Sequence, residues 1–154
     1  MQPVMRTESG LEIDLGNRIG IGACLSENGN RRTTARSATT VLVVEDDVLV
    51  RFATAADLRD AGYRVIEAAT AEEARTALET REPVALVFSD IDLPGAWQGT
   101  DLARWLRDYA PGVKVILTSS AFHAIAGLKT CDGFLPKPYL AEEVTANVKK
   151  LLGR

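Results

Sequence analysis

From residue 40 onward, five short apolar runs alternate with segments in which apolar residues have helical spacing. The runs are rich in β-branched and aromatic residues and cover 41–45, 63–66, 84–88, 113–117 and 133–135. Runs of this length and composition predict strands. The stretch Val41–Val44 is entirely apolar, which predicts a central parallel strand that is buried on both faces.

The intervening segments predict helices. These are expected at 47–61, from Thr70 to the break at Pro83, around 102–109 and at 141–152, with a short fourth helix at 120–129. Thr70 and Glu73 have the spacing of a capping box, which marks the start of the second helix.

Strands that alternate with helices at this spacing indicate an α/β fold, a doubly wound parallel sheet with helices on both faces. Right-handed crossovers place the carboxyl ends of all the strands at one edge of the sheet. Ligands of such folds bind in the crevice beyond that edge. Candidate functional residues are therefore expected at the strand ends.

The first 39 residues differ in composition from the rest of the chain. They hold five of the twelve glycines and end in the polar stretch 26–37. Such a segment cannot supply a packed core, so residues 1–39 are expected to form a flexible N-terminal extension and residues 40–154 the folded domain. The alternating residues Leu11, Ile13 and Leu15 leave a short strand in the extension as the alternative.

Charge and hydropathy exclude several classes of partner. The net charge is -3 and the basic residues are not clustered, so no nucleic-acid interface is predicted. The longest apolar runs are far shorter than a membrane span, so no membrane association is expected. Cys24 and Cys131 lie far apart and lack metal-ligand spacing. They are expected to be free thiols, which indicates a cytoplasmic protein.

Polar groups follow the apolar runs at four strand ends. Glu45 and Asp46 follow the first run, Asp90 the third, Thr118 the fourth and Lys137 the fifth. Asp90 precedes the Pro94-Gly95 pair, so ordinary turn chemistry is an alternative explanation for this aspartate taken alone. The other three strand ends favour a functional site.

Three carboxylates at one edge repel one another, and a hard divalent cation would resolve the repulsion. Mg²⁺ takes such oxygen ligands together with a phosphate, and Glu45, Asp46 and Asp90 offer them. Lys137 adds a positive charge that an incoming phosphoryl group would use. This combination predicts Mg²⁺-dependent phosphoryl transfer onto Asp90, which is ionised at neutral pH and needs no general base.

The polar groups at these four strand ends stand in the order found in receiver domains of two-component response regulators. Residues 40–153 resemble that family. The resemblance implies a flavodoxin-like five-stranded sheet in the order 2-1-3-4-5 and a phosphoryl group accepted by Asp90. It also implies a Mg²⁺ site formed by Glu45, Asp46, Asp90 and the backbone carbonyl of Asp92. The other implied roles are a switch hydroxyl at Thr118, a switch aromatic at Phe134, a lysine that pairs with the phosphoryl group at Lys137, and a loop-setting proline after a cis bond at Pro138.

A member of this family would take its phosphoryl group from a sensor histidine kinase or a histidine phosphotransfer protein. It would then pass the group on, or bind a downstream protein through the face of the fourth helix, fifth strand and fifth helix (120–129, 133–135 and 141–152). No output domain follows in this sequence, so a stand-alone receiver is expected. It would be no enzyme apart from phosphoryl transfer to and from its own aspartate.

Two other functions remain open. The short segment 120–129 favours a binding module of the same fold that works without phosphorylation, although the intact set of strand-end residues argues against it. Asp90 and Asp92 also form the Asp-x-Asp pair of haloacid-dehalogenase-type phosphatases. However, Pro94 stands where that family has Thr or Val, and the chain is too short for the cap of such an enzyme.

Several other residues have simpler structural interpretations. Asp47 is expected to be the N-cap of the first helix, and Trp105 and Tyr109 are expected in the core. Trp97 lies in a turn that is one residue longer than is usual in the family, and it is expected to be exposed near the site. Four glutamates are expected to form a solvated helix face: Glu72, Glu73, Glu79 and Glu82.

Overall fold

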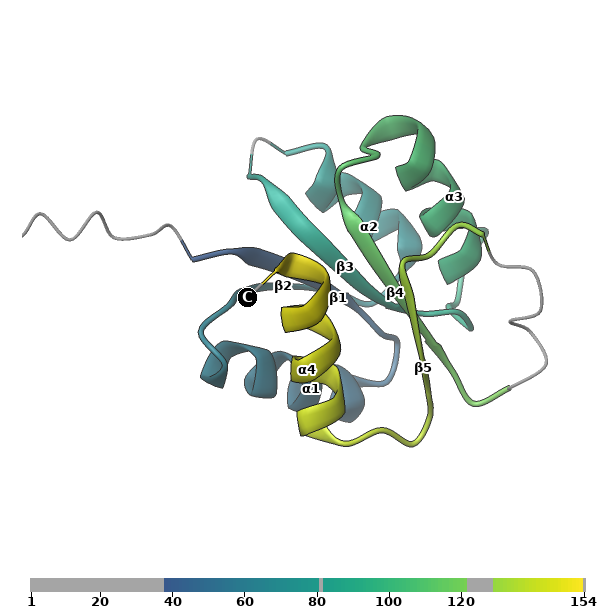
Figure 1. Cartoon of the computed structure of the whole chain (residues 1–154). Helices are drawn as coiled ribbons and strands as arrows, with labels where there is room; N and C mark the ends of the chain where they lie inside the picture. The colour runs from purple at the N-terminus through teal and green to yellow at the C-terminus, as the bar shows by residue number, and fades with distance from the viewer. Residues whose placement is uncertain (1–37, 81, 122–128, 154) are drawn as a thin grey trace, which may run out of the picture. The chain divides into compact units, whose positions relative to one another are not determined.

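The computed structural model describes residues 38–80, 82–121 and 129–153 (Figure 1). Its strands are β1 (Thr40–Val44), β2 (Arg64–Ala68), β3 (Val84–Asp90), β4 (Lys114–Ser119) and β5 (Gly133–Pro136). Its helices are α1 (Val48–Asp60), α2 (Ala71–Leu78), α3 (Gly99–Tyr109) and α4 (Ala141–Leu152). The expected N-terminal extension, up to residue 37, and the centre of the helix expected at 120–129 lie outside the described residues.

The five strands form one parallel sheet in the order β2-β1-β3-β4-β5. This confirms the predicted α/β fold and its flavodoxin-like strand order. β1 lies between β2 and β3, and all of its residues are buried, as its apolar run predicts. Because the sheet is parallel, the carboxyl ends of the strands lie at the same edge.

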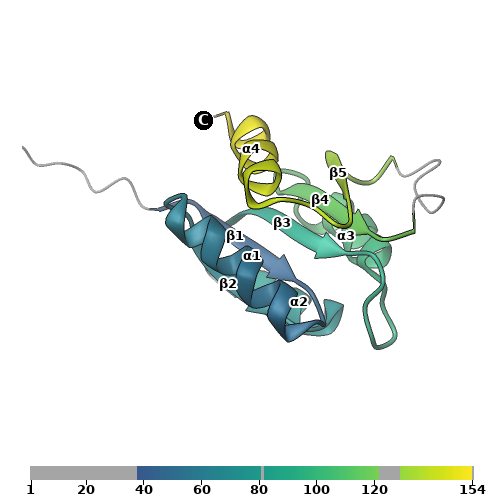
Figure 2. The same ribbon diagram turned by 90° about the horizontal axis from the view of Figure 1, so that it is seen from below.

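Among the described elements, α2 and α3 cover one face of the sheet, and α1 and α4 cover the other (Figures 1 and 2). On one face, α2 and α3 pack against a cluster that contains Leu42 and Val87. On the other face, α1 and α4 pack against a cluster that contains Val43 and Phe88. Neighbouring residues of a strand point to opposite faces, so β1 and β3 supply both clusters and their apolar runs need no polar alternation.

Side chains fix the starts of two helices, as the sequence predicts. Asp47 caps α1, because one of its carboxylate oxygens accepts the N–H groups of Leu49 at 2.8 Å and Val50 at 3.1 Å. Thr70 caps α2 by accepting the N–H of Glu73 at 3.1 Å. These bonds satisfy backbone donors that have no partner within the helix.

Helical spacing predicts Tyr109 in the core, and this prediction is wrong, since 54% of the residue is exposed. Tyr109 is the last residue of α3 and stacks on Trp105, with the ring centroids 4.3 Å apart. It therefore packs along its own helix. No helix in the described part of the chain has both the length and the apolar character needed to cross a membrane.

Candidate functional site

The candidate site lies at the edge of the sheet where β1, β3, β4 and β5 end. Asp90 is the last residue of β3, and Thr118 of β4 is its partner in the register of the two strands. Glu45 and Asp46 follow β1 directly, and Lys137 follows β5 directly. The fold thus gathers the five strand-end residues from four separate parts of the chain.

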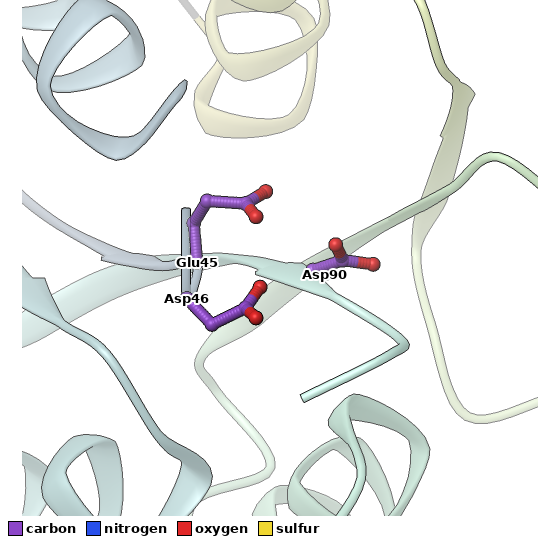
Figure 3. Close-up of side chains that lie close together, drawn as sticks. All are labelled: Glu45, Asp46 and Asp90. Carbon is purple, nitrogen blue, oxygen red and sulfur yellow. The ribbon is translucent and has the colours of Figure 1, made fainter. Parts of the chain in front are cut away.

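Glu45, Asp46 and Asp90 form an acidic cluster (Figure 3). Each residue offers one carboxylate oxygen, and these oxygens lie within 4.8 Å of one another. Glu45 and Asp90 are buried, with 3% and 5% of their surface exposed, whereas Asp46 is exposed. Burial raises the pKa of Glu45 above its ordinary value, against the opposing effect of the Lys137 ammonium.

Lys137 supplies positive charge to the acidic cluster. Its ammonium donates to Glu45 Oε2 at 2.8 Å and to Asp90 Oδ2. Burial disfavours the charged ammonium, but the bonds to the two carboxylates outweigh this and raise the pKa of Lys137 well above its ordinary value. The next peptide bond, between Lys137 and Pro138, is cis.

Arg51 holds the backbone of the acidic pair, a role that the sequence analysis missed. Its guanidinium donates to the carbonyl of Glu45 at 2.6 Å and to that of Asp46 at 3.4 Å. It also lies 3.7 Å from a carboxylate oxygen of Glu67 on β2. The only signal in the sequence is that Arg51 is the first basic residue after three acids.

β4 contributes two hydroxyl groups to this edge of the sheet. Thr118 is fully buried, and its Oγ1 has no hydrogen-bond partner among the described residues. Ser119 donates to Asp92 Oδ2 at 3.2 Å. A buried hydroxyl without a partner is unfavourable, so Thr118 keeps a bonding capacity that a group entering the site could use.

The residues present fit a hard cation together with an anion. The acidic cluster offers oxygen atoms, the donor type that Mg²⁺ prefers. Asp92 adjoins the acidic cluster, because its N–H donates to Asp90 Oδ1 at 3.0 Å. Lys137 and the unpartnered hydroxyl of Thr118 can both bond to a negatively charged oxygen. The site can therefore hold a cation between carboxylates and a phosphoryl group beside it.

The loop after β3 is closed back onto the site. The N–H of Gly99 donates to the carbonyl of Ile91 at 2.9 Å. A Cβ at Gly99 would lie 1.9 Å from the backbone oxygen of Asp90, so only glycine fits there. The side-chain amide of Gln98 donates to the carbonyl of Leu93 at 3.0 Å and accepts its N–H at 3.2 Å. The sequence analysis missed Gln98, because such a side-chain bridge has no characteristic pattern.

Two aromatic residues near the site pack inward. Trp97 is predicted to be exposed near the site, which is wrong, because it is half-buried and packs on Trp105 with ring centroids 6.4 Å apart. The guanidinium of Arg75 lies 5.4 Å from the centroid of the Trp97 ring. Phe134 of β5 is half-buried and packs against the core cluster on the α2 and α3 side.

Residues 41–149 match the family model described as the response regulator receiver domain. The chain is 36% identical over 127 residues to the sensor kinase CckA of Brucella abortus. The aligned region makes up 79% of this chain and 13% of that protein. It is 31% identical over 121 residues to the phosphate regulon transcriptional regulatory protein PhoB of Pseudomonas aeruginosa, covering 75% of this chain and 52% of that protein. The chain thus spans a small part of the kinase and about half of the regulator.

Solved structures share the fold over most of their own length. The CheY-like response regulator receiver domain protein of Methanospirillum hungatei has 29% identity and a TM-score of 0.69, covering 76% of this chain and 95% of that chain. The response regulator protein TrrA of Thermotoga maritima, solved in complex with Mg²⁺-BeF, has 29% identity and a TM-score of 0.68, covering 73% of this chain and 98% of that chain.

Proposed function

Because this chain belongs to the family of response regulator receiver domains, we propose that it accepts a phosphoryl group on Asp90 in a two-component pathway. The donor would be a sensor histidine kinase or a histidine phosphotransfer protein. The observation that carries the proposal is the acidic cluster of Glu45, Asp46 and Asp90 with the Lys137 ammonium bonded into it.

Mg²⁺ is the cofactor of this proposal, since receiver domains bind it in an acidic pocket. Glu45, Asp46, Asp90 and the backbone carbonyl of Asp92 would hold the ion. When bound, Mg²⁺ neutralises negative charge on the phosphoryl oxygens. Oε2 of Glu45 already binds Lys137, and Oε1 accepts the N–H of Asp47 at 3.3 Å. The exposed carboxylate of Asp46 is therefore the ligand that solvent reaches most easily.

The reaction forms an acyl phosphate on Asp90. An oxygen of the ionised carboxylate attacks phosphorus, and the bond between phosphorus and the histidine nitrogen of the donor breaks, its electron pair leaving with the imidazole. Lys137 is bonded to Asp90 Oδ2 before transfer. Its ammonium would exchange that bond for one to a phosphoryl oxygen, so the positive charge stays paired throughout and Lys137 loses no proton. The leaving imidazole is neutral when its other ring nitrogen carries a proton.

Thr118 is the switch group of this proposal, because its buried hydroxyl lies beside Asp90 and has no hydrogen-bond partner within the described part of the chain. A phosphoryl oxygen would be the missing acceptor and would draw Thr118 toward Asp90. Phe134 lies on the neighbouring strand β5, where Leu135 pairs with Thr118. Its ring, which already packs against the core cluster on the α2 and α3 side, would move further inward into the space that Thr118 leaves. This would carry the change to the surface of β5.

The surface around the acidic cluster suits docking of a protein donor. Four large apolar side chains on the segments that follow the acidic pair and Lys137 are between 64% and 79% exposed, and we call them the apolar rim: Val48, Leu49, Phe52 and Leu140. The first three lie on α1, directly after the acidic pair, and Leu140 follows Lys137 by three residues. Exposed apolar groups that gather in one place mark interaction surfaces. A phosphodonor that packs on the apolar rim would bring its histidine close to Asp90.

A cavity of about 390 Å³ lies beside Lys137. It is lined by Val50, Ser120, Lys137, Pro138 and Tyr139. A side chain of the donor could enter it and fix the donor against the loop that carries Lys137. Downstream, the phosphorylated receiver would act in the cytoplasm. It would pass the group on or bind a target through β5, α4 and the segment 120–129.

Beryllium fluoride, a stable mimic of a phosphoryl group, tests this proposal through thermal unfolding. Beryllium fluoride and Mg²⁺ together should raise the Tm of the wild type more than Mg²⁺ alone, because the mimic binds the acceptor carboxylate. Asp90→Asn should abolish the additional rise, whereas Asp108→Asn, an exposed aspartate on α3, should retain it. A rise that survives in Asp90→Asn would contradict the assignment. A target that binds Asp90→Ala as tightly as the phosphorylated wild type would favour the phosphorylation-independent module.

A further inference from the structure

Helix α2 holds the tip of the loop that follows β3. Glu72 lies in the first turn of α2, and its Oε1 accepts the N–H groups of Ala96 at 3.1 Å and Trp97 at 3.2 Å. The loop residues lie 24 and 25 positions further along the chain. Helical spacing predicts Glu72 on a solvated face, and the residue is exposed as predicted. Spacing did not reveal that its carboxylate also binds the loop.

Gly95 permits this close approach. Its φ is +106°, and a Cβ there would lie 2.9 Å from Oε2 of Glu72. Another residue would be strained at this φ and would displace the carboxylate. The N–H groups of Glu72 itself, Ala96 and Trp97 hold the pKa of Glu72 below its ordinary value. Glu72 is therefore ionised at neutral pH and acts as a charged acceptor.

A second residue of α2 contacts the same loop. Arg75 lies three positions after Glu72, so the two side chains leave the helix on the same face. Its guanidinium lies 5.4 Å from the ring centroid of Trp97, which also packs on Trp105 of α3. We call Glu72 and Arg75 the α2 clasp. It binds the loop through both the backbone and the side chain of Trp97.

The tip of the loop is connected to the acidic cluster by a short hydrogen-bonded path. The two bonds between Gln98 and Leu93 close the segment 93–98, and the bond from Gly99 to Ile91 closes its base. Asp92 lies between these closures, with its own N–H bonded to Asp90 Oδ1. A displacement of the tip would therefore be passed to the backbone of Asp92, whose carbonyl is a Mg²⁺ ligand in the proposed function.

We propose that Glu72 is a positioning residue for the metal site, acting through the loop backbone to orient the carbonyl of Asp92. This inference rests on the proposed function and adds to it a means of regulating metal binding. Helix α2, which contributes no ligand, would adjust the affinity of the acidic cluster for Mg²⁺. A protein that displaced the α2 clasp from Trp97 would thereby weaken metal binding and slow phosphoryl uptake.

Mg²⁺ titration followed by tryptophan fluorescence tests the inference. Glu72→Gln removes the charge and Glu72→Asp shortens the reach, so both should weaken Mg²⁺ binding by about tenfold, as is typical when a group that orients a metal ligand is lost. In the metal-free protein, the N–H groups of Ala96 and Trp97 should exchange with solvent faster in both variants. At saturating Mg²⁺, the rate of phosphoryl uptake from acetyl phosphate should return to that of the wild type.

Glu73→Gln is the matched control, because it removes the same charge from the same helical turn. Glu73 accepts the N–H of Ala69 at 2.7 Å and, among the described residues, makes no hydrogen bond to the loop. The affinity of the Glu73→Gln variant for Mg²⁺ should therefore stay within about twofold of the wild type. An equal loss in Glu73→Gln would overturn the inference in favour of a general charge effect. Unchanged Mg²⁺ affinity in both Glu72 variants would also overturn it. Failure of the wild type to bind Mg²⁺ would contradict the proposed function itself.

Discussion

Lys137→Met should destabilise the metal-free protein, because it leaves the acidic cluster without its ammonium. The Lys137 ammonium contacts side chains of Glu45 and Asp90 that are 4% and 7% exposed, and is itself 22% exposed. Two unit charges 4.8 Å apart, the outer limit within the acidic cluster, interact by about 3.5 kcal/mol at an effective dielectric constant of 20. Removing one partner of a buried ion pair costs roughly 3 to 5 kcal/mol. Since Lys137 is partly exposed, we expect a loss of about 3 kcal/mol.

The loss should shrink as the pH falls from 7.5 to 5. Burial already raises the pKa of Glu45 in the wild type, and removal of the ammonium raises it further. A carboxyl whose pKa is higher in the folded state than in the unfolded state destabilises the fold as the pH rises through that interval. The pKa of Lys137 is raised, so its ammonium is charged in the wild type at both pH values. Its full contribution to the free energy of unfolding is therefore present at both. The gap between wild type and variant should therefore narrow on acidification.

Urea unfolding in EDTA and in 10 mM Mg²⁺ measures both effects. Mg²⁺ should stabilise Lys137→Met more than the wild type, because a cation bound among the carboxylates supplies the missing charge. Lys114→Met is the matched control, since Lys114 also pairs with a carboxylate, Asp132 at 3.4 Å, but is 42% exposed. It should cost less than about 1 kcal/mol and leave the response to Mg²⁺ unchanged. A Lys137→Met protein within about 0.5 kcal/mol of the wild type in EDTA, or a gap that widens on acidification, would refute this reasoning.

Three further substitutions test other parts of the site. Thr118→Val should change the unfolding free energy, measured in urea, by less than about 1 kcal/mol, because the buried hydroxyl has no partner among the described residues. The same substitution should abolish the change in tryptophan fluorescence when beryllium fluoride binds. Gly99→Ala should lower the unfolding free energy by about 3 kcal/mol, because its Cβ would collide with the backbone oxygen of Asp90. Phe52→Ala should slow phosphoryl transfer from a phosphorylated partner protein by roughly tenfold and leave uptake from acetyl phosphate unchanged.

The parts of the fold that depend on local sequence could be predicted. The apolar run of β1 and the caps Asp47 and Thr70 act within a few residues, so spacing alone identifies them. Periodicity separates strands from helices but does not order the strands. The order β2-β1-β3-β4-β5 came from the family resemblance, and it is what makes Thr118 the neighbour of Asp90.

The contacts that could not be predicted join distant parts of the chain. Glu72 belongs to the polar face of α2 by spacing. Its bonds to Ala96 and Trp97 depend on how α2 packs beside the loop that follows β3. Trp97 is half-buried because it packs between α2 and Trp105 of α3. Arg51 bonds backbone carbonyls rather than an acidic side chain of its own helix, so its place after three acids does not reveal which groups it binds. Sequence identified the groups to which the proposed function assigns the chemistry, but not those that hold them in position.

The intact mass of the protein after incubation with Mg²⁺ and acetyl phosphate tests the central claim most directly. The account predicts a gain of one phosphoryl group in the wild type, no gain when EDTA replaces Mg²⁺, and no gain in Asp90→Asn. Wild type without any gain in the presence of Mg²⁺, or an equal gain in Asp90→Asn, would contradict the claim that Asp90 is the phospho-acceptor.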